Sequence, residues 1–304
     1  KAAASGKHVS VLVEIKARFD EEHNMREARK MEQAGCFVTY GSGNIKTHAK
    51  MMMIVRSKDE SVTRYVHLSS GNYNEETAKS YTDVSLMTTD EAYAHDVAEF
   101  FNAITGHSLP QRYNIITAPL NTRKQLTALI RQEAQSAREG LSSGIVLKVN
   151  ALEDEAIMEE LYKASQAGVP IQLIVRGICC LRPAQAGVSD NITVRSIVGT
   201  FLEHARIFYF HRQGDPQVYV GSTDMMLRSF EARIESLFII KDPVLRQQVI
   251  NLLTYDLRDN ANAYLMHEDC TKVKVKPQGE PIFNIHKAFF HVTLEEVMQA
   301  RLFT

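Results

Sequence analysis

The sequence predicts an α/β protein made of two similar units, each a mixed β-sheet flanked by helices. Three observations support this prediction. Short β-type runs alternate with helical stretches along the 304 residues. A His-x-Lys pair in the first half of the chain returns as a His-x-Arg pair in the second half, and a glycine-led turn with an amide or an acid follows each pair. A doubled order of elements indicates an internal repeat, with one site at the interface of its two copies.

The first unit is expected to span residues 1–112. Gly35 ends its first helix and Gly106 ends its last. The apolar runs between these helices predict strands. The expected elements are a strand at 11–15, a helix at 20–33, a strand at 36–40, a buried strand at 51–55 and a helix at 90–105.

The second unit is expected to span residues 113–304, after a short link that contains Pro110. Helical periodicity and regularly placed glycines divide it into alternating helices and strands. The expected elements are a helix at 121–138, a strand at 145–149, a helix at 153–166, a strand at 171–175 and a further strand that begins at Ile192.

Composition narrows the function classes. The formal net charge is −1, which argues against a general nucleic-acid surface, so a polyanion must meet a local basic cluster. The four cysteines show neither metal-ligand spacing nor a disulfide framework. No apolar run approaches the length of a membrane span and no signal peptide is visible, so a cytoplasmic location is expected. The chain does not begin with Met, and we expect it to be part of a longer protein.

The segment Lys46-Thr47-His48-Ala49-Lys50 carries the central chemical signal. On an extended chain, His48 and Lys50 project from the same face and can reach the same anion. An imidazole can attack phosphorus or move a proton, and an ammonium neutralises charge that develops on phosphate oxygens. The second pair, His204 and Arg206, is chemically unequal to the first because a guanidinium does not share a proton. One histidine can therefore be the nucleophile and the other its acid–base partner.

The doubled pattern resembles the phospholipase D superfamily, whose paired His-x-Lys motifs meet across a pseudo-twofold axis. Narrower motifs resemble the C-terminal catalytic part of type-1 polyphosphate kinase, from the first residues to past Glu235. These motifs read VEIKARFDEE at 13–22, KTHAK at 46–50, SGNYN at 70–74, YTD at 81–83, IVRGICCLRP at 174–183 and FLEH at 201–204.

The resemblance implies two phospholipase D-like domains and a specific reaction. The terminal phosphate of ATP would pass reversibly to His48, as a phosphohistidine, and then to inorganic polyphosphate, with release of ADP. His204 would protonate the leaving or accepting phosphate, and Mg²⁺ would screen the phosphate charges. Family members form homo-oligomers, dimers or tetramers, and associate loosely with the inner membrane, so the resemblance implies both properties here.

The resemblance also implies contacts to ATP and polyphosphate. Arg18 falls at the family's magnesium site, where a guanidinium, which has no lone pair to give a metal, would act through phosphate oxygens. Tyr81 would lie against the nucleotide. The other implied contacts are Lys50, Asn72, Arg176, Arg182, His204, Arg206 and Arg233.

Arg176 and Arg182 follow the end of a predicted strand, where two guanidiniums can make forked bonds to a chain of phosphates. Their alternative is a structural ion pair with Glu203 or Asp224. Departures from the family pattern at Thr200 and in 223–230 bear on phosphate affinity and chain-length preference more than on the chemistry.

Two other function classes stay open. A phosphodiesterase or phosphatidyl-transferase of the wider superfamily would use the doubled histidines equally well. Both halves, however, lack the downstream acid that its motif expects, and Val55 stands in that place after Lys50. A module that holds polyphosphate without turning it over is the other, because further domains of the family are absent from this sequence.

Overall fold

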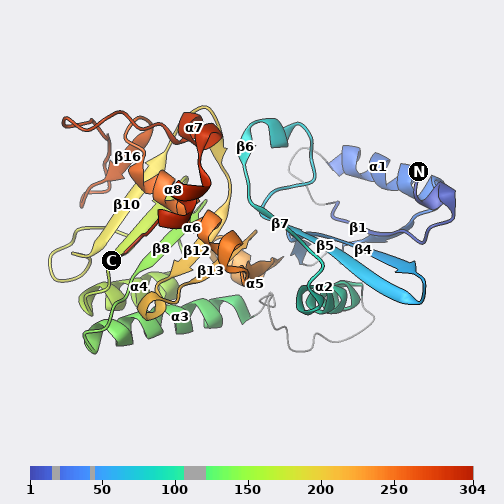
Figure 1. The fold of residues 1–304 in the computed structure, drawn as a ribbon, viewed down its shortest axis with the longest axis horizontal. Coiled ribbons are helices and arrows are strands. Elements are labelled where there is room, and N and C mark those ends of the chain that lie inside the picture. Colours follow the sequence, from blue (N-terminus) through green and yellow to red (C-terminus); the bar gives the residue numbers. More distant parts are fainter. Residues whose placement is uncertain (16–20, 42–44, 106–120, 304) are drawn as a thin grey trace.

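The computed structural model describes residues 1–15, 21–41, 45–105 and 121–303. Arg18 and the expected domain boundary at residue 112 lie outside these residues. The described chain forms two α/β halves, with the first half on the right of Figure 1 and the second on the left.

The second half is built on one mixed sheet of eight strands. Three neighbouring strands run parallel, and the strands outside them pair antiparallel. The strands predicted at 145–149 and 171–175 are confirmed, since apolar runs fill positions that are buried on both faces of the sheet. In sheet order the strands are β15 (Leu237–Ile239), β13 (Gln217–Gly221), β12 (Arg206–Phe210), β8 (Ile145–Val149), β9 (Ile171–Val175), β10 (Ile192–Ile197), β16 (Ala263–Met266) and β17 (Lys272–Lys274).

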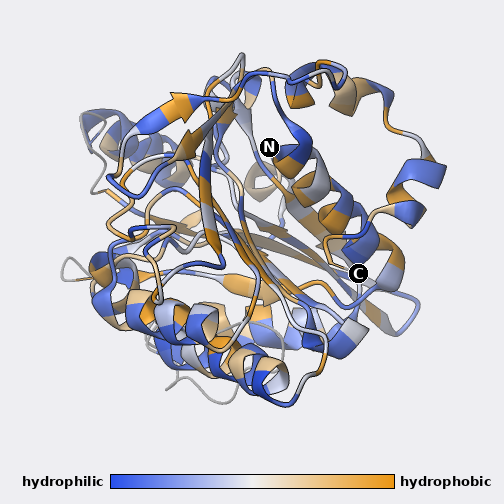
Figure 2. Ribbon diagram, turned by 90° about the vertical axis from the view of Figure 1, so that its left-hand side faces the viewer, coloured by the Kyte–Doolittle hydropathy of each residue, from blue (hydrophilic) through white to orange (hydrophobic). Residues whose placement is uncertain are grey.

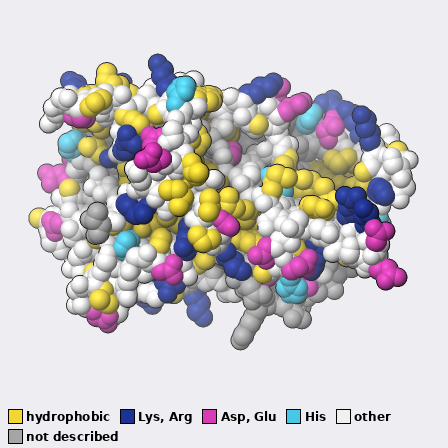
Figure 3. All heavy atoms as spheres, viewed as in Figure 1, with side chains coloured by type: hydrophobic (Ala, Val, Ile, Leu, Met, Phe, Trp, Pro, Cys, Tyr) yellow, Lys and Arg dark blue, Asp and Glu magenta, His cyan; other side chains and the backbone are white. Residues whose placement is uncertain are grey.

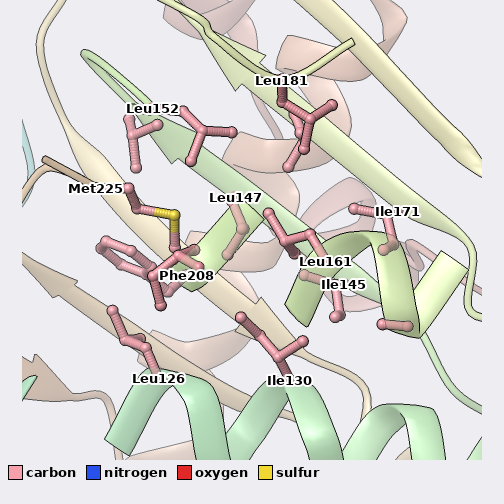
Figure 4. Close-up of a cluster of buried hydrophobic side chains, with 14 of the residues drawn as sticks. Leu126, Ile130, Ile145, Leu147, Leu152, Leu161, Ile171, Leu181, Phe208 and Met225 are labelled. Atoms are coloured by element: carbon pink, nitrogen blue, oxygen red, sulfur yellow. The ribbon is translucent and has the colours of Figure 1, made fainter. Parts of the chain in front are cut away.

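Helices cover both faces of this sheet (Figure 2). On one face, Leu126 and Ile130 project from the first helix of this half toward Phe208 and its neighbours (Figure 4). On the other face, a long helix capped by Asp242 joins a second core cluster. The helices are α3 (Thr122–Arg138), α4 (Glu155–Gln166), α5 (Leu227–Glu231), α6 (Pro243–Arg258), α7 (Ile285–Ala288) and α8 (Leu294–Gln299).

The first half divides its strands between two sheets, where the sequence predicts one. A parallel pair lies beside an antiparallel sheet of three strands, and the predicted helices at 20–33 and 90–105 are both present. The elements are β1 (Ser10–Val13) and β2 (Phe37–Tyr40) in one sheet, β4 (Lys50–Lys58), β5 (Ser61–Ser69) and β7 (Ser85–Thr88) in the other, and the helices α1 (Glu21–Gln33) and α2 (Glu91–Ile104).

The prediction that 51–55 is a buried strand is wrong. These residues lie in β4, and Ile54 and Val55 are 55% and 57% exposed. The β4–β5 hairpin packs one face, which includes Val66 and Leu68, into the core that α2 completes. The opposite face carries Ile54, and the end of the hairpin extends beyond the helix.

Two short parallel pairings join the halves. β3 (Lys46–Thr47) pairs with β14 (Arg233–Ile234), and β6 (Tyr81–Thr82) pairs with β11 (Leu202–Glu203). One core cluster also contains buried side chains of both halves. Each pairing therefore sets a segment of one half directly before a histidine against a segment of the other half. Within the described residues, no helix is long and apolar enough to cross a membrane.

Candidate active site

His48 is held by a carboxylate from the other half of the molecule. Its Nδ1 lies 2.8 Å from Oε2 of Glu235, which is 1% exposed, and Ser222 Oγ donates to the same oxygen at 2.5 Å. A carboxylate oxygen accepts, so Nδ1 carries the hydrogen and Nε2 keeps its lone pair. Nε2 is the atom that this arrangement leaves for attack.

His204 is held in the same way, by a carboxylate and a serine that come from the first half. Its Nδ1 lies 2.8 and 3.1 Å from the two carboxylate oxygens of Asp83, and Ser70 Oγ donates to Asp83 at 2.6 Å. The other ring nitrogen, Nε2, lies 3.0 Å from Nη1 of Arg206. Because a guanidinium only donates, the lone pair of this Nε2 is occupied.

The two supports match in sequence as well as in space. Each serine precedes its carboxylate by 13 positions, from Ser70 to Asp83 and from Ser222 to Glu235. The backbone N–H of His48 donates to Ile234 at 2.8 Å, and that of His204 donates to Thr82 at 3.2 Å. The halves thus exchange carboxylates, each holding the histidine of the other, and the site requires both.

Cationic side chains gather around the two histidines. Lys50, 6% exposed, donates from Nζ to the His48 carbonyl. Arg206 makes a two-bond ion pair with Asp224, at 3.1 and 3.3 Å. Arg233 lies 3.9 Å from Glu235, and the guanidinium of Arg176 donates to Asn150 Oδ1. This concentration of positive charge suits an anion with several phosphates.

Burial and these cations lower several pKa values. Burial lowers the pKa of His48, Lys50 and Arg206 lower it further, and Glu235 acts in the opposite direction. The pKa of His204 is also lowered, mainly by burial, against the effect of Asp83. Both imidazoles are therefore neutral near pH 7 without a ligand. Burial lowers the pKa of Lys50 to about 7.

A pocket of about 410 Å³ opens beside the β6–β11 pairing. Its walls include Tyr81, Phe201 and Phe289, and Asp83 also reaches its lining. The Tyr81 ring centroid lies 5.0 Å from that of His204. The pocket is therefore an aromatic cavity next to the support of the second histidine.

Lys148, Glu203 and His286, which also line this pocket, belong to a buried charge cluster. Lys148 Nζ donates to Glu203 at 2.5 Å and to both oxygens of Asp256, at 2.8 and 2.6 Å. The other oxygen of Glu203 lies 2.6 Å from His286 Nε2. Burial acts to raise the pKa of Glu203, but Lys148 and His286 hold it below its usual value. The cluster anchors β11 immediately before His204.

Comparison with known proteins identifies the family. The family model "Polyphosphate kinase C-terminal domain 1" matches residues 1–110, and "Polyphosphate kinase C-terminal domain 2" matches residues 115–285. The chain belongs to the polyphosphate kinase family. Polyphosphate kinase 1 of Chlorobaculum tepidum is 48% identical over 270 residues, which cover 88% of this chain and 39% of that protein. The polyphosphate kinase of Halalkalibacterium halodurans is 46% identical over 285 residues, 93% of this chain and 40% of that protein.

A solved polyphosphate kinase has the same fold. The crystal structure of the Porphyromonas gingivalis enzyme superimposes with a TM-score of 0.88 at 37% identity, covering 95% of this chain and 44% of that one. The predicted α/β fold class is confirmed. The chain spans about two fifths of the length of the curated polyphosphate kinases that it matches.

The structure brings together most of the predicted site residues. Tyr81 touches His204, and Arg176, Lys50, Arg206 and Arg233 surround the histidine pair. Arg176 bonds to Asn150, while the alternative ion-pair partners proposed for it are taken by other cations.

Two predicted phosphate contacts have exposed side chains and stay predictions. The side chain of Asn72 is exposed, and the His48 ring is held by Glu235 in place of an amide of that turn. Arg182 is also exposed, and its backbone bonds to Tyr162 and Ser189. Arg18 lies outside the described residues.

Sequence reasoning did not assign the carboxylates their role. Asp83 stood in the quoted YTD motif and Glu235 within the stretch that resembles the family, but neither was expected to hold a histidine. The available signal was the repeated 13-residue interval from each serine to its carboxylate. Glu14 was also missed as a support: its Oε2 accepts from the backbone N–H of Thr47 at 2.7 Å and so fixes the segment that carries His48.

The described residues contain no group of three or more His, Cys, Asp or Glu side chains that could hold a metal ion. Around the histidines, the donors that face the site are mainly cationic nitrogens, which repel a divalent cation. These residues therefore do not form a site for protein-bound Mg²⁺.

Proposed function

We propose that this chain carries the catalytic centre of an ATP:polyphosphate phosphotransferase, with His48 as the nucleophile. The observation that supports this choice is the difference between the two Nε2 atoms. His48 Nδ1 is anchored on Glu235 and its Nε2 has no hydrogen-bond partner within the described residues, whereas Nε2 of His204 accepts from Arg206. A neutral imidazole with an open Nε2 is the form that attacks phosphorus.

The proposed reaction has two reversible steps. Nε2 of His48 bonds to the terminal phosphorus of ATP while the bond from that phosphorus to the bridging oxygen breaks, and ADP leaves. A terminal oxygen of polyphosphate then attacks the phosphohistidine and restores the imidazole. His204, a neighbouring imidazole supported by Asp83, exchanges the proton with the leaving or attacking phosphate through its Nε2, which becomes free when the bound phosphate takes over the guanidinium of Arg206.

The surrounding cations neutralise the transferred phosphate. Lys50, two residues after His48, contacts its oxygens, and Arg176, Arg206 and Arg233 bind the phosphates on either side. Mg²⁺ bound to the nucleotide would screen the phosphate charges, and the described residues contain no group of three or more His, Cys, Asp or Glu side chains that could hold it. The aromatic pocket beside Tyr81 takes the nucleoside of ATP.

The same proposal extends to partners. ATP, ADP and inorganic polyphosphate are the expected substrates, and the family relationship favours a homo-oligomer in the cytoplasm. Nucleic acid is not an expected partner, given the net charge of −1. Arg18 as a phosphate contact, and a peripheral association with the inner membrane, stay predictions.

The proposal is tested by phosphoryl labelling of the full-length parent protein. Incubation with γ-labelled ATP and Mg²⁺ should give a label that is stable to alkali and labile to acid. His48→Ala should take up no label, whereas His23→Ala, at an exposed position on α1, should label normally. Hydrolysis of a phosphodiester substrate without labelling would favour a phosphodiesterase. Polyphosphate binding without label or turnover would favour a silent binding module.

A further inference from the structure

The two short pairings that join the halves are equivalent in the internal repeat. In each pairing, one strand runs directly into a histidine and the other runs directly into the carboxylate that holds it. β3 leads to His48 and β14 to Glu235, while β11 leads to His204 and β6 to Asp83. Both pairings are parallel, and in both the residue two positions before the histidine is aligned with the residue two positions before the carboxylate. These two positions can therefore be compared directly between the pairings.

The side chains at these positions differ in chemical type. The β6–β11 pairing has Tyr81 beside Leu202, an aromatic ring and an apolar side chain. The β3–β14 pairing has Arg233 beside Lys46, two cations. Because residues two apart on an extended chain project from the same face, each pair faces the same way as its histidine and carboxylate. A site that is symmetric at its centre thus has an aromatic end and a cationic end.

Contacts at both ends support this direction. The Tyr81 ring centroid lies 5.0 Å from that of His204, and the pocket of about 410 Å³ opens beside it. At the other end, Arg233 Nη1 lies 3.9 Å from Glu235 Oε1. The aromatic end suits a flat base, as proposed above for the nucleoside of ATP, whereas the cationic end provides charged donors for phosphate oxygens.

A third cation, Arg228, lies near the cationic end, in the short helix α5 that precedes β14. Burial lowers the pKa of Lys46, and the charges of Arg233 and Arg228 lower it further. Glu14 and Glu235 act in the opposite direction. Burial also lowers the pKa of Arg233, and Arg228 adds to this effect. The three cations are thus close enough to repel one another, and an anion that contacts all three would relieve this repulsion.

Nearby carboxylates do not fully neutralise these cations. Within the described part of the chain, neither Lys46 nor Arg228 forms an ion pair with a carboxylate. Oε2 of Glu235 is bonded to His48, and its Oε1 has no hydrogen-bond partner among the same residues. Elsewhere the charges are mixed, since Figure 3 shows Lys and Arg side chains interspersed with Asp and Glu over the visible face. The cationic end is therefore a local feature of the kind that binds a polyanion.

We infer that the cationic end binds the acceptor: Lys46, Arg228 and Arg233 contact the phosphates of a polyphosphate chain behind its reacting end, while the nucleotide occupies the aromatic end. The inference rests on the proposed function and adds to it which end of the site receives each substrate. Two residues of extended chain span about 6.5 Å, so Lys46 lies roughly that far before His48 along its strand. The cations therefore reach phosphates behind the terminal one, which itself meets His48.

Transfer at this end balances without a further reactant. A terminal oxygen of the chain attacks the phosphorus on Nε2 of His48, the phosphorus–nitrogen bond breaks, and its electron pair returns to the imidazole. The chain leaves one phosphate longer. ADP and polyphosphate present a terminal oxygen to the same phosphorus in turn, but the rest of each molecule lies at a different end of the site. A variant at the cationic end should therefore impair one acceptor and spare the other.

The test uses the full-length parent protein, labelled on its histidine with γ-labelled ATP and then freed of nucleotide. Loss of label is measured at increasing concentrations of polyphosphate or of ADP, so that both acceptors are tested on the same labelled protein. In Lys46→Gln and Arg228→Gln, the polyphosphate concentration for half-maximal loss should rise at least about tenfold, as expected when a charge-assisted bond is lost. The ADP concentration for half-maximal loss should stay nearly the same.

Two further variants control for charge and for position. Lys46→Arg keeps the positive charge and should restore most of the affinity for polyphosphate. Lys58→Gln removes an exposed cation at the end of the β4–β5 hairpin and should alter the response to neither acceptor.

The outcomes separate this inference from the proposed function. An unchanged polyphosphate requirement in both Lys46→Gln and Arg228→Gln would overturn the inference alone. An equal rise for polyphosphate and ADP would also overturn it, because the cations would then act on a phosphate that both acceptors share. A parent protein that takes up no label would instead contradict the proposed phosphotransfer, and this inference with it.

Discussion

The two halves of this molecule have nearly the same scaffold around their histidines but bury it differently. In each half, a serine and a carboxylate 13 residues later support the histidine of the other half. The second half encloses one eight-stranded sheet between helices, while the first divides its strands between two sheets and leaves one face open. The symmetry is thus kept where the halves meet and is lost at the periphery.

Within the site, the halves differ in the cation that follows each histidine by two residues and in the group to which this cation is bonded. Arg206 is neutralised by Asp224 and donates to His204. Lys50 donates to a backbone carbonyl, and the position that corresponds to Asp224 is Asn72, whose side chain is exposed. The comparison indicates how a doubled scaffold gives two roles. The guanidinium of Arg206 donates to Nε2 of its histidine, whereas the ammonium of Lys50 leaves Nε2 of its histidine open and can contact a substrate.

The largest effect is expected at the support of His48. In the parent protein, Glu235→Gln should lower turnover by about 10³–10⁴-fold, because an amide can hold the imidazole in the wrong tautomer and does not stabilise a positive charge on it. Turnover and uptake of label from γ-labelled ATP would both be measured.

Asp83→Asn provides the matched comparison. It perturbs the proton-exchanging histidine and should reduce turnover while retaining slow formation of the labelled protein. If the two variants lost label equally, the division of roles between the halves would be wrong.

The next effect concerns stability and separates the buried half from the open one. Lys148→Met leaves Glu203 and Asp256 buried without their shared cation, so the free energy of unfolding should fall by about 3–5 kcal/mol. Urea denaturation measures this change. Lys58→Met, in an exposed pair with Asp59 in the first half, should leave the midpoint unchanged. A Lys148→Met protein as stable as the original would show that the cluster does not anchor β11.

Local patterns were sufficient to predict much of the fold. The strands 145–149 and 171–175 and the helix at 121–138 were predicted within a residue, because buried strands read as apolar runs and helices end at marked glycines. The buried strand at 51–55 was predicted wrongly, because an apolar run does not reveal whether a neighbour covers both of its faces.

The site was predictable in its residue types and much less in its pairings. The histidines and their cations follow from short motifs. The supports do not, since Glu235 reaches His48 across 187 positions and Asp83 reaches His204 across 121. Such contacts depend on how the two halves dock, and a local pattern carries no information on docking.

A smaller effect tests why the first half has glycine where the second half has a larger residue. A Cβ on Gly71 would lie 2.3 Å from Asp83 Oδ2, so Gly71→Ala should displace this carboxylate from His204. A misplacement of this kind lowers turnover by about 10²-fold, measured as kcat in the parent protein. The corresponding residue is Thr223, whose hydroxyl has no hydrogen-bond partner within the described residues, and Thr223→Ala should keep near-normal turnover. Equal losses in both variants would contradict the asymmetry.

The smallest effect concerns the titration of Lys50, which loses its positive charge at a pH where an arginine would keep it. The pKa of Lys50 is about 7, so its ammonium is present below that pH and is lost as the pH rises through it. For the parent protein, kcat/KM for ATP should therefore fall as the pH rises above about 7, since this parameter reports groups of the free enzyme. Lys50→Arg keeps its charge and should remove this fall from the activity that remains, while kcat itself should drop, because a guanidinium at this position can donate to Nε2 of His48 as Arg206 does to His204. The acid limb should lie below pH 6.5 in both proteins, because burial lowers the pKa of His48 from its ordinary value of 6.5 and the imidazole loses its nucleophilic lone pair only when it is protonated. If the basic limb of the pH profile survives in Lys50→Arg, another group causes it. The titration of Lys50 would then not be the feature that distinguishes the two halves.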